Sequence, residues 1–480
     1  MKSIRNILYI LLCPILFSAC SWLDVGTKSE IDADEMFQTT EGYYTALTGV
    51  YVNMGGTALY GGNIPLLATE PLTRQYTVPS DDTDRSKWSQ YDYTTPGAKT
   101  FIDEVWGEMY NTIVNCNLLL ENLQKEDCPE FEPGVWEILS GEALGLRAYM
   151  FFDLLRIYNE AYSVNPECKN VPLKKDFGFA LGEQATTEQV LTSLVSDLKY
   201  AQELLKPNDP ISSGKNYDNK YLAYARNQRM NYYAVTALLA RIELYRGDYT
   251  AAYEYADEII SSTQFRFIEE EEIIETDMYG KELKIDRIFM PEMIFALANE
   301  NILSTSRSSY ESLNGDFVKS ESCYESGDVR RNWLYINPSA NNKINLIKYQ
   351  RSTLAEDSYK YEVSTVPMLK LGEMYLIAAE AVLKDASAGG VAPIENLNIL
   401  KGERNTTQLS TDADATTIEA QITREYICEF KGEGQLFFYY KRRNEQSIDD
   451  GYYSGNTTMM QTANYTWPLP EYEQDFGYGN

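Results

Sequence analysis

Histidine is absent from this sequence, and its absence removes whole classes of chemistry. Ser-His-Asp and Cys-His catalysis, zinc sites with histidine ligands, and histidine as an acid or base near pH 7 are all excluded. Basic residues are also scarce. The chain has 42 Lys and Arg against 71 Asp and Glu, which gives a formal charge of -29. A field of that sign repels phosphate backbones and anionic lipid surfaces. We therefore expect no nucleic-acid partner and no membrane attachment through a basic patch.

Cysteine is sparse, with seven in 480 residues. Beyond the first twenty residues the chain has no CxxC pair and no obvious disulfide framework. We interpret its five cysteines mostly as small buried apolar residues, although the sequence leaves open one bridge, for instance between Cys128 and Cys168. These five are Cys116, Cys128, Cys168, Cys323 and Cys428.

Cofactor and metal motifs are missing too. The acidic run from Glu269 to Glu272 lacks the Asp/Asn/Gly alternation of a calcium loop, so we interpret it as solvated charge. Gly432-x-Gly434 follows no strand and has no basic P-loop residue, so it is no nucleotide signal. The sequence therefore predicts no cofactor and no metal.

A single long apolar run stands at the N-terminus. Lys2 and Arg5 precede an apolar stretch, Ile7 to Phe17, that is too short to span a bilayer and is typical of an export signal. It ends in FSAC at Cys20, which resembles the lipobox of bacterial lipoproteins; an ordinary secretory signal is the alternative. We expect residues 1–19 to be a lipoprotein signal peptide and Cys20 to carry the lipid. Losing Lys2 and Arg5 changes the charge from -29 to -31.

Helical periodicity dominates the remaining chain. The most diagnostic segment, Met230 to Ile260, predicts two helices joined by a Gly247-Asp248 turn, and it resembles a tetratricopeptide unit; a generic helical hairpin is the alternative. A second pair is expected over 368–384 and 394–402. Further helices are expected over about 41–54, 101–123, 135–160, 187–205 and 417–430, with a capping box at 186–189.

Two long irregular regions, about 55–97 and 265–352, interrupt these helices. Loops of that length are usually functional or mobile. The second region contains a short β-like run at 292–297. The sequence therefore predicts a mainly α protein with two loop-rich insertions and few short strands.

Several segments, in order along nearly the whole chain, resemble the SusD/RagB family of outer-membrane nutrient-binding lipoproteins. They read CSWLDVGTKSEI, GEALGLRAYMFFDLLRIYNE, TEQVLTSLVSDLKYAQELL, the 230–260 hairpin, EMIFAL, VPMLKLGEMYLIAAEAVLK and ENLNILKGERN. The C-terminal block departs from the family pattern, with Tyr439 and Tyr440 where Asp and Leu are common.

The resemblance implies a SusD-like domain over 20–480, in which tetratricopeptide-like helix pairs form an α-α superhelix that carries a loop-rich ligand lobe. It implies a non-enzymatic lipoprotein on the surface of the outer membrane. Such a protein binds nutrient oligosaccharides and delivers them to a SusC-like TonB-dependent transporter. A RagB-like peptide-binding lipoprotein is the alternative within the family. A secreted glycosidase with two carboxylates is disfavoured, because the helical pattern and the family blocks oppose it.

Sugars present apolar faces rimmed by hydroxyls, so a site needs exposed aromatic rings with polar groups at their edges. Trp88 is our preferred platform because charged and turn residues surround it, whereas Trp106 and Trp136 lie on apolar helix faces and are interpreted as core. The other candidates are Asn63, Arg74, Asp81, Arg85, Tyr91 and Tyr93 in the first loop region, and Tyr310 and Tyr324 in the second.

Overall fold

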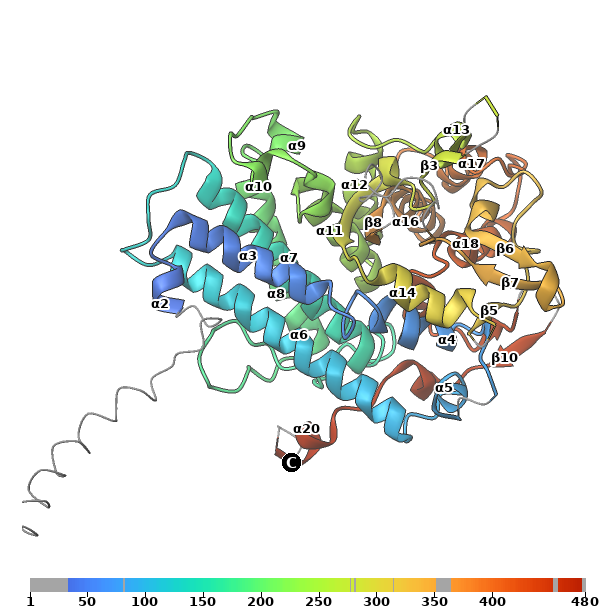
Figure 1. The fold of residues 1–480 in the computed structure, drawn as a ribbon, viewed down its shortest axis with the longest axis horizontal. Helices are drawn as coiled ribbons and strands as arrows, with labels where there is room; N and C mark the ends of the chain where they lie inside the picture. Colours follow the sequence, from blue (N-terminus) through green and yellow to red (C-terminus); the bar gives the residue numbers. More distant parts are fainter. Residues whose placement is uncertain are drawn as a thin grey trace, which may run out of the picture.

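The computed structural model describes residues 33–80, 83–276, 278–279, 282–313, 315–350, 364–451 and 456–476. Helices predominate, as predicted, and the loop-rich part gathers at one end of the helical stack (Figure 1). The expected signal peptide, Cys20 and Asp81 lie outside the described residues. No helix in the described part of the chain is long and apolar enough to cross a membrane.

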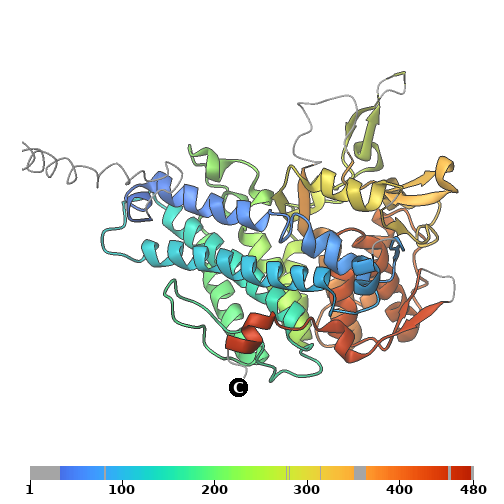
Figure 2. The ribbon, with the colours of Figure 1, turned by 60° about the horizontal axis from the view of Figure 1, so that its bottom comes forward.

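Long helices form the scaffold. They are α3 (Thr40–Met54), α6 (Pro96–Leu123), α7 (Val135–Tyr158), α8 (Thr187–Leu205), α11 (Tyr232–Arg246), α12 (Tyr249–Ile260), α16 (Leu371–Lys384), α17 (Pro393–Glu403) and α18 (Ala415–Glu429). They pack largely in chain order, α3 on α6, then α7, α8, α11, α12 and α16, and α17 and α18 both contact α16 (Figures 1 and 2). This stacking agrees with the superhelical arrangement that the family resemblance implies.

Local signals explain where these helices begin and end. The capping box at the start of α8 is present, because Thr186 and Gln189 satisfy each other's backbone N–H groups. The hairpin predicted over Met230–Ile260 is confirmed as α11 and α12. Gly247 joins them with φ 83°, a left-handed conformation that a side chain would disfavour.

Shorter helical elements fill the connections. They are α2 (Ala33–Met36), η1 (Asn63–Ala68), α4 (Thr69–Leu72), α5 (Thr83–Trp88), α9 (Pro210–Ser213), α10 (Lys220–Ala223), η2 (Arg226–Gln228), α13 (Glu270–Ile273), η3 (Met290–Glu292), α14 (Ile302–Ser306), η4 (Arg307–Glu311), η5 (Val329–Trp333), η6 (Pro338–Ala340), α19 (Gln435–Arg443), η7 (Thr462–Tyr465) and α20 (Glu471–Phe476). The region expected to be irregular at 55–97 therefore holds η1, α4 and α5, and α6 begins inside it at Pro96.

The strands are short, as predicted. They are β1 (Tyr76–Thr77), β2 (Ile274–Thr276), β3 (Glu282–Ile285), β4 (Met293–Ala298), β5 (Phe317–Val318), β6 (Leu334–Asn337), β7 (Lys343–Leu346), β8 (Thr365–Lys370), β9 (Ser447–Asp449) and β10 (Thr457–Met459). All pairings are antiparallel; the largest sheet has the order β1-β5-β7-β6, and β4 pairs with β8. Pairing of β1 with β5 joins the two loop regions into one lobe.

The C-terminal segment returns to the N-terminal helices. After α19, the chain crosses to α6, where Glu473 accepts a hydrogen bond from Trp106 Nε1 at 3.3 Å and Glu471 pairs with Lys99. The backbone N–H of Trp467 donates to the Ile157 carbonyl at 3.1 Å. The C-terminal segment thus packs against the N-terminal helices α6 and α7.

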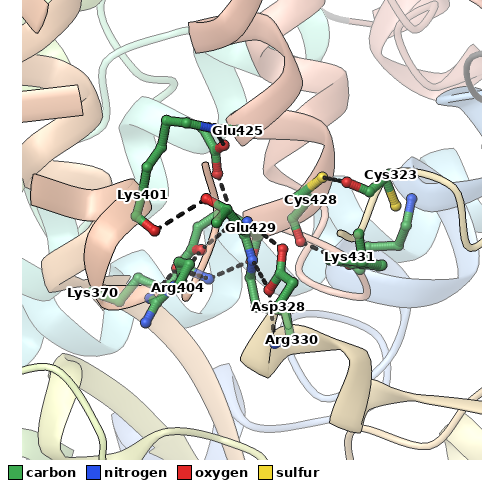
Figure 3. A network of polar contacts seen from close by, with 12 residues as sticks. Cys323, Asp328, Arg330, Lys370, Lys401, Arg404, Glu425, Cys428, Glu429 and Lys431 are labelled. Carbon is green, nitrogen blue, oxygen red and sulfur yellow. Dashed lines mark hydrogen bonds and ion pairs between the residues drawn. The ribbon is translucent and has the colours of Figure 1, made fainter. Parts of the chain in front are cut away.

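All five cysteines in the described residues are free thiols. The bridge left open between Cys128 and Cys168 is not formed, so that possibility is wrong for this structure. Three of the five, Cys116, Cys323 and Cys428, are at most 1% exposed, in line with their interpretation as small buried residues. Cys428 Sγ donates to the Cys323 carbonyl at 3.4 Å (Figure 3).

Candidate functional site

Trp88 ends the short helix α5, and its ring is buried. Only 1% of the residue is exposed, its Nε1 donates to the Ala68 carbonyl at 2.7 Å, and its ring packs edge to face on Trp467. The expectation of an exposed platform is therefore wrong. Its charged neighbour Lys87 is exposed, whereas the tryptophan at the end of α5 turns inward onto a distant aromatic ring. Trp106 is buried as predicted, whereas Trp136 is only half-buried.

The other predicted residues of the first loop region also hold the lobe together. The hydroxyls of Tyr91 and Tyr93 donate to the carbonyls of Leu72 and Asn464, at 2.9 and 2.6 Å. Asn63 is buried, and its amide nitrogen donates to Glu104 at 3.1 Å. Both tyrosines are half-buried, so part of each residue remains accessible.

Tyr310 and Tyr324, from the second loop region, are buried as well. Tyr310 is 0% exposed and donates to the Leu66 carbonyl at 2.6 Å; Tyr324 is 3% exposed and donates to the Cys428 carbonyl at 2.9 Å. Burial raises the pKa of both phenols well above its ordinary value. Their expected role as exposed ligand platforms is wrong, because Tyr310 packs inside the lobe against Tyr76 and Tyr324 is buried against α18.

Two arginines stand at the rim of this lobe. Arg74 Nη2 contacts Asp450 at 3.1 Å and its Nη1 donates to the Ser89 carbonyl, while Arg85 pairs with the buried Asp316. Their side chains are 24% and 20% exposed. Of the predicted residues, these two place charged groups at the surface of the lobe.

The same loop carries local backbone strain. Arg74 and Tyr91 adopt positive φ angles, 63° and 66°, which are uncommon for residues with a side chain. Such conformations persist where the surroundings enforce them. The hydrogen bonds from Arg74 to Ser89 and from Tyr91 to Leu72 do so here, and they give the loop one defined shape.

A buried ionic network joins η3, η5, β8, the C-terminal end of α17, and α18 (Figure 3). Arg404 binds Glu292 and Glu429 with paired contacts of 2.5 to 3.0 Å, and all three side chains are 0% exposed. Arg330 contacts Glu429 at 3.0 Å and also binds Asp328 and Glu425. The network fixes the helices that support the loops.

Burial and charge act against each other in this network. Burial would raise the pKa of Glu429, but Arg404, Lys370 and Arg330 hold it well below its usual range. Burial lowers the pKa of the Lys348 ammonium to about 8, although Glu433 contacts it. Cationic and anionic side chains thus compensate one another inside the network, which supports the fold.

The structure shows residues paired with the predicted site residues that could not be identified from the sequence. Asp316 and Asp450 meet Arg85 and Arg74 from segments far along the chain, and no local pattern marks them. Glu292 and Glu429 look like ordinary acidic residues in a chain with 71 of them. Within the described residues, no group of three or more His, Cys, Asp or Glu side chains is arranged to hold a metal ion.

Two family models match successive halves of the chain. Residues 21–244 match a model described as "Starch-binding associating with outer membrane", and residues 252–475 match the model of the SusD family. The chain belongs to the SusD/RagB family. Among curated proteins, none matches it significantly.

Solved structures of SusD proteins share the fold. A SusD superfamily protein from Bacteroides vulgatus is 20% identical, with a TM-score of 0.71 over 92% of this chain and 97% of that chain. One from Bacteroides fragilis is 18% identical, with a TM-score of 0.70 over 92% and 99%. Surface glycan-binding protein A from Bacteroides thetaiotaomicron, in complex with laminarihexaose, is 18% identical, with a TM-score of 0.67 over 92% and 98%. At these identities the likeness shows the fold.

Proposed function

We propose that this protein is a lipoprotein of the outer-membrane surface that binds nutrient oligosaccharides and delivers them to a SusC-like TonB-dependent transporter. The observation that carries the proposal is the match of residues 21–244 to a SusD-type family model described as starch-binding and associated with the outer membrane. The FSAC sequence at Cys20 supports the lipid anchor, and the glycan-bound relative with the same fold supports the ligand class. We propose binding without catalysis.

The rim of the loop lobe is the proposed ligand surface. Arg74 and Arg85 offer partly exposed guanidinium groups, and Tyr91 and Tyr93 add half-buried aromatic side chains, on a loop whose shape is fixed. Sugars are recognised by such rings and donors together. Trp88, Tyr310 and Tyr324 support this surface from below.

A RagB-like peptide receptor is the second candidate, because the SusD family model covers residues 252–475 without distinguishing the ligand class. A glycan array on the soluble chain that starts after Cys20 separates the two. Binding to glycans supports the proposal, and strong binding to peptides with no glycan bound would reverse the order. Glycans recovered unchanged after incubation argue for a receptor; cleaved products would indicate a glycosidase.

The partner is tested separately. The tagged lipoprotein is recovered from gently solubilised outer membrane, and large proteins that co-purify are identified by mass spectrometry. We expect a TonB-dependent barrel in stoichiometric amounts. Recovery of the lipoprotein alone, under conditions that preserve other membrane complexes, would count against the transporter.

A further inference from the structure

A groove of about 420 Å³ lies on the helical scaffold, away from the loop lobe. The C-terminal half of α6, the N-terminal half of α7, one face of α8 and the loop before α8 form its walls. Its volume is within the range of small-ligand sites. The lining residues used below are Asn117, Glu121, Trp136, Ser140, Lys175 and Tyr200.

Two aromatic residues line this groove, and two more lie on the loop before α8 that supplies Lys175 to its wall. Tyr200 is 48% exposed on α8, and the half-buried Trp136 is held by its Nε1, which donates to the Leu123 carbonyl at 2.9 Å. Phe177 and Phe179, on the loop before α8, are 45% and about fully exposed. Two aromatic rings, those of Trp136 and Tyr200, thus line the groove, and such rings provide platforms for the apolar faces of sugars.

The polar wall of the groove is already fixed. Asn117 donates to the carbonyls of Lys174 and Asp176, at 3.1 and 3.0 Å, and Glu121 accepts from the backbone N–H of Phe177 at 2.8 Å. These bonds attach the loop to α6. A wall with this rigidity loses little conformational freedom when a ligand binds.

One hydroxyl in the groove lacks a protein partner. Ser140 is 3% exposed, and within the described residues its Oγ makes no hydrogen bond. A buried hydroxyl without a partner costs free energy, so native structures usually satisfy it. A ligand hydroxyl in the groove is a chemically matched partner.

The charges of the groove cancel locally. Arg147 and Lys175 both contact Asp197, each at 2.8 Å, and Glu121 adds a second carboxylate. Two cations thus face two anions, so these charges sum to zero. The wall therefore suits a neutral ligand with hydroxyl groups.

We propose that this groove is a second carbohydrate site, which takes a short segment of a neutral oligosaccharide. The inference rests on the proposed function and places a site beyond the loop lobe. Along α6, the distance from Glu104, which contacts Asn63 of the lobe, to Glu121 is about 25 Å. One long glycan can reach both surfaces, so the two sites would bind it together more tightly than either alone.

The test uses calorimetric titration of the soluble chain with neutral hexasaccharides of the β-glucan, α-glucan, mannan and xylan types. Tyr200→Ala should weaken binding about thirtyfold, as loss of an aromatic hot spot does. Tyr224→Ala is the matched control, because Tyr224 is 73% exposed on a different surface. Thermal melts should be unchanged for both variants, since both rings are exposed.

A fluorescence titration with the same hexasaccharides gives a second readout. Ligand in the groove should shift the emission of Trp136, and Trp136→Phe should remove that shift while the ring packing is kept. If binding is lost in Arg85→Ala but unchanged in Tyr200→Ala, the groove is not a sugar site and the proposed function stands. If the protein binds charged glycans and no neutral ones, the inference about the groove is overturned, but the proposed function stands. If no glycan binds at all, the proposed function fails and the inference fails with it.

Discussion

Trp88 and Trp467 pack edge to face with ring centroids 4.8 Å apart, although they lie near opposite ends of the chain. The ring centroids of Tyr93 and Phe101 lie 4.9 and 5.6 Å from that of Trp88, and the centroid of Tyr158 lies 6.1 Å from that of Trp467. This aromatic cluster joins the start of α6, the end of α7 and the C-terminal segment. It explains why the most prominent tryptophan of the predicted ligand loop belongs to the core.

Trp88→Ala is therefore expected to destabilise the fold by about 3–5 kcal/mol, because it leaves a cavity and an unpaired Ala68 carbonyl. Urea denaturation measures the free energy of unfolding. Gln90→Ala, at an exposed position two residues later, is the control and should change it by less than about 0.5 kcal/mol. An unchanged unfolding midpoint with lost ligand binding would restore the platform role.

The buried pair of Arg404 and Glu292 can be compared with an exposed pair of similar geometry. Arg266 binds Glu272 with two contacts of 2.7 Å, but its side chain is 54% exposed, whereas Arg404 is 0% exposed. Arg404→Met should cost about 3–5 kcal/mol, because it leaves Glu292 and Glu429 buried without this cation.

For Arg266→Met we expect a change of less than about 1 kcal/mol, since water screens that pair. Both values come from urea melts at pH 7. Equal costs for the two substitutions would show that burial does not set the contribution of these pairs.

Lys441 on α19 predicts a pH dependence. Burial, together with the nearby Arg156, lowers the pKa of its ammonium to about 7, although Cys168 and Glu160 act in the opposite direction. Its Nζ donates to the Ile157 carbonyl at 3.2 Å. An unfolded lysine titrates near pH 10.4. Between about pH 7 and 10.4 the unfolded chain holds a proton that the folded chain lacks, so this residue makes stability rise with pH there.

Lys441→Met removes that contribution. The variant should exceed the wild type in stability most at pH 6, and its advantage should shrink by on the order of 3 kcal/mol towards pH 10. Denaturant melts at four pH values measure this difference. Lys125→Met, at an exposed position, is the control. If the difference in unfolding free energy between Lys441→Met and the wild type does not change with pH, Lys441 stays protonated in the folded state.

Cys20→Ser tests the anchor. Without the thiol no lipid can be attached, so the protein should leave the membrane fraction and lose the mass of the acyl chains. Globomycin-type inhibition of the lipoprotein signal peptidase in the wild type should give the unprocessed precursor. An unchanged membrane fraction for Cys20→Ser would disprove the lipobox assignment.

The helical scaffold was predictable because its signals are local. The capping box at Thr186, the Gly247 turn and the spacing of apolar residues in α6 each act within a few residues. The secondary structure of segments with little periodicity could be predicted less accurately. In 55–97, Gly, Pro and polar residues predicted irregular chain, yet contacts with β5 and with the C-terminal segment impose short helices there.

The candidate site could be predicted less well, for a physical reason. Composition shows that aromatic and polar residues are present in a loop, but exposure depends on which distant segment covers them. Trp467 covers Trp88, and η1 accepts the hydroxyl of Tyr310. Conversely, Trp136 has apolar neighbours in its helix, and only the positions of α6 and α8 leave it partly open.

The closure of the C-terminal segment on α6 also bears on the order in which the protein can fold. A chain delivered N-terminus first presents α6 and Trp88 long before Trp467 follows. Until then, the aromatic cluster lacks one of its rings and Trp106 lacks its partner Glu473. Contacts between such distant residues carry a high entropic cost of loop closure and slow folding. The segment from η7 to α20 thus completes the aromatic cluster, so the native packing around Trp88 forms only after this segment has reached α6.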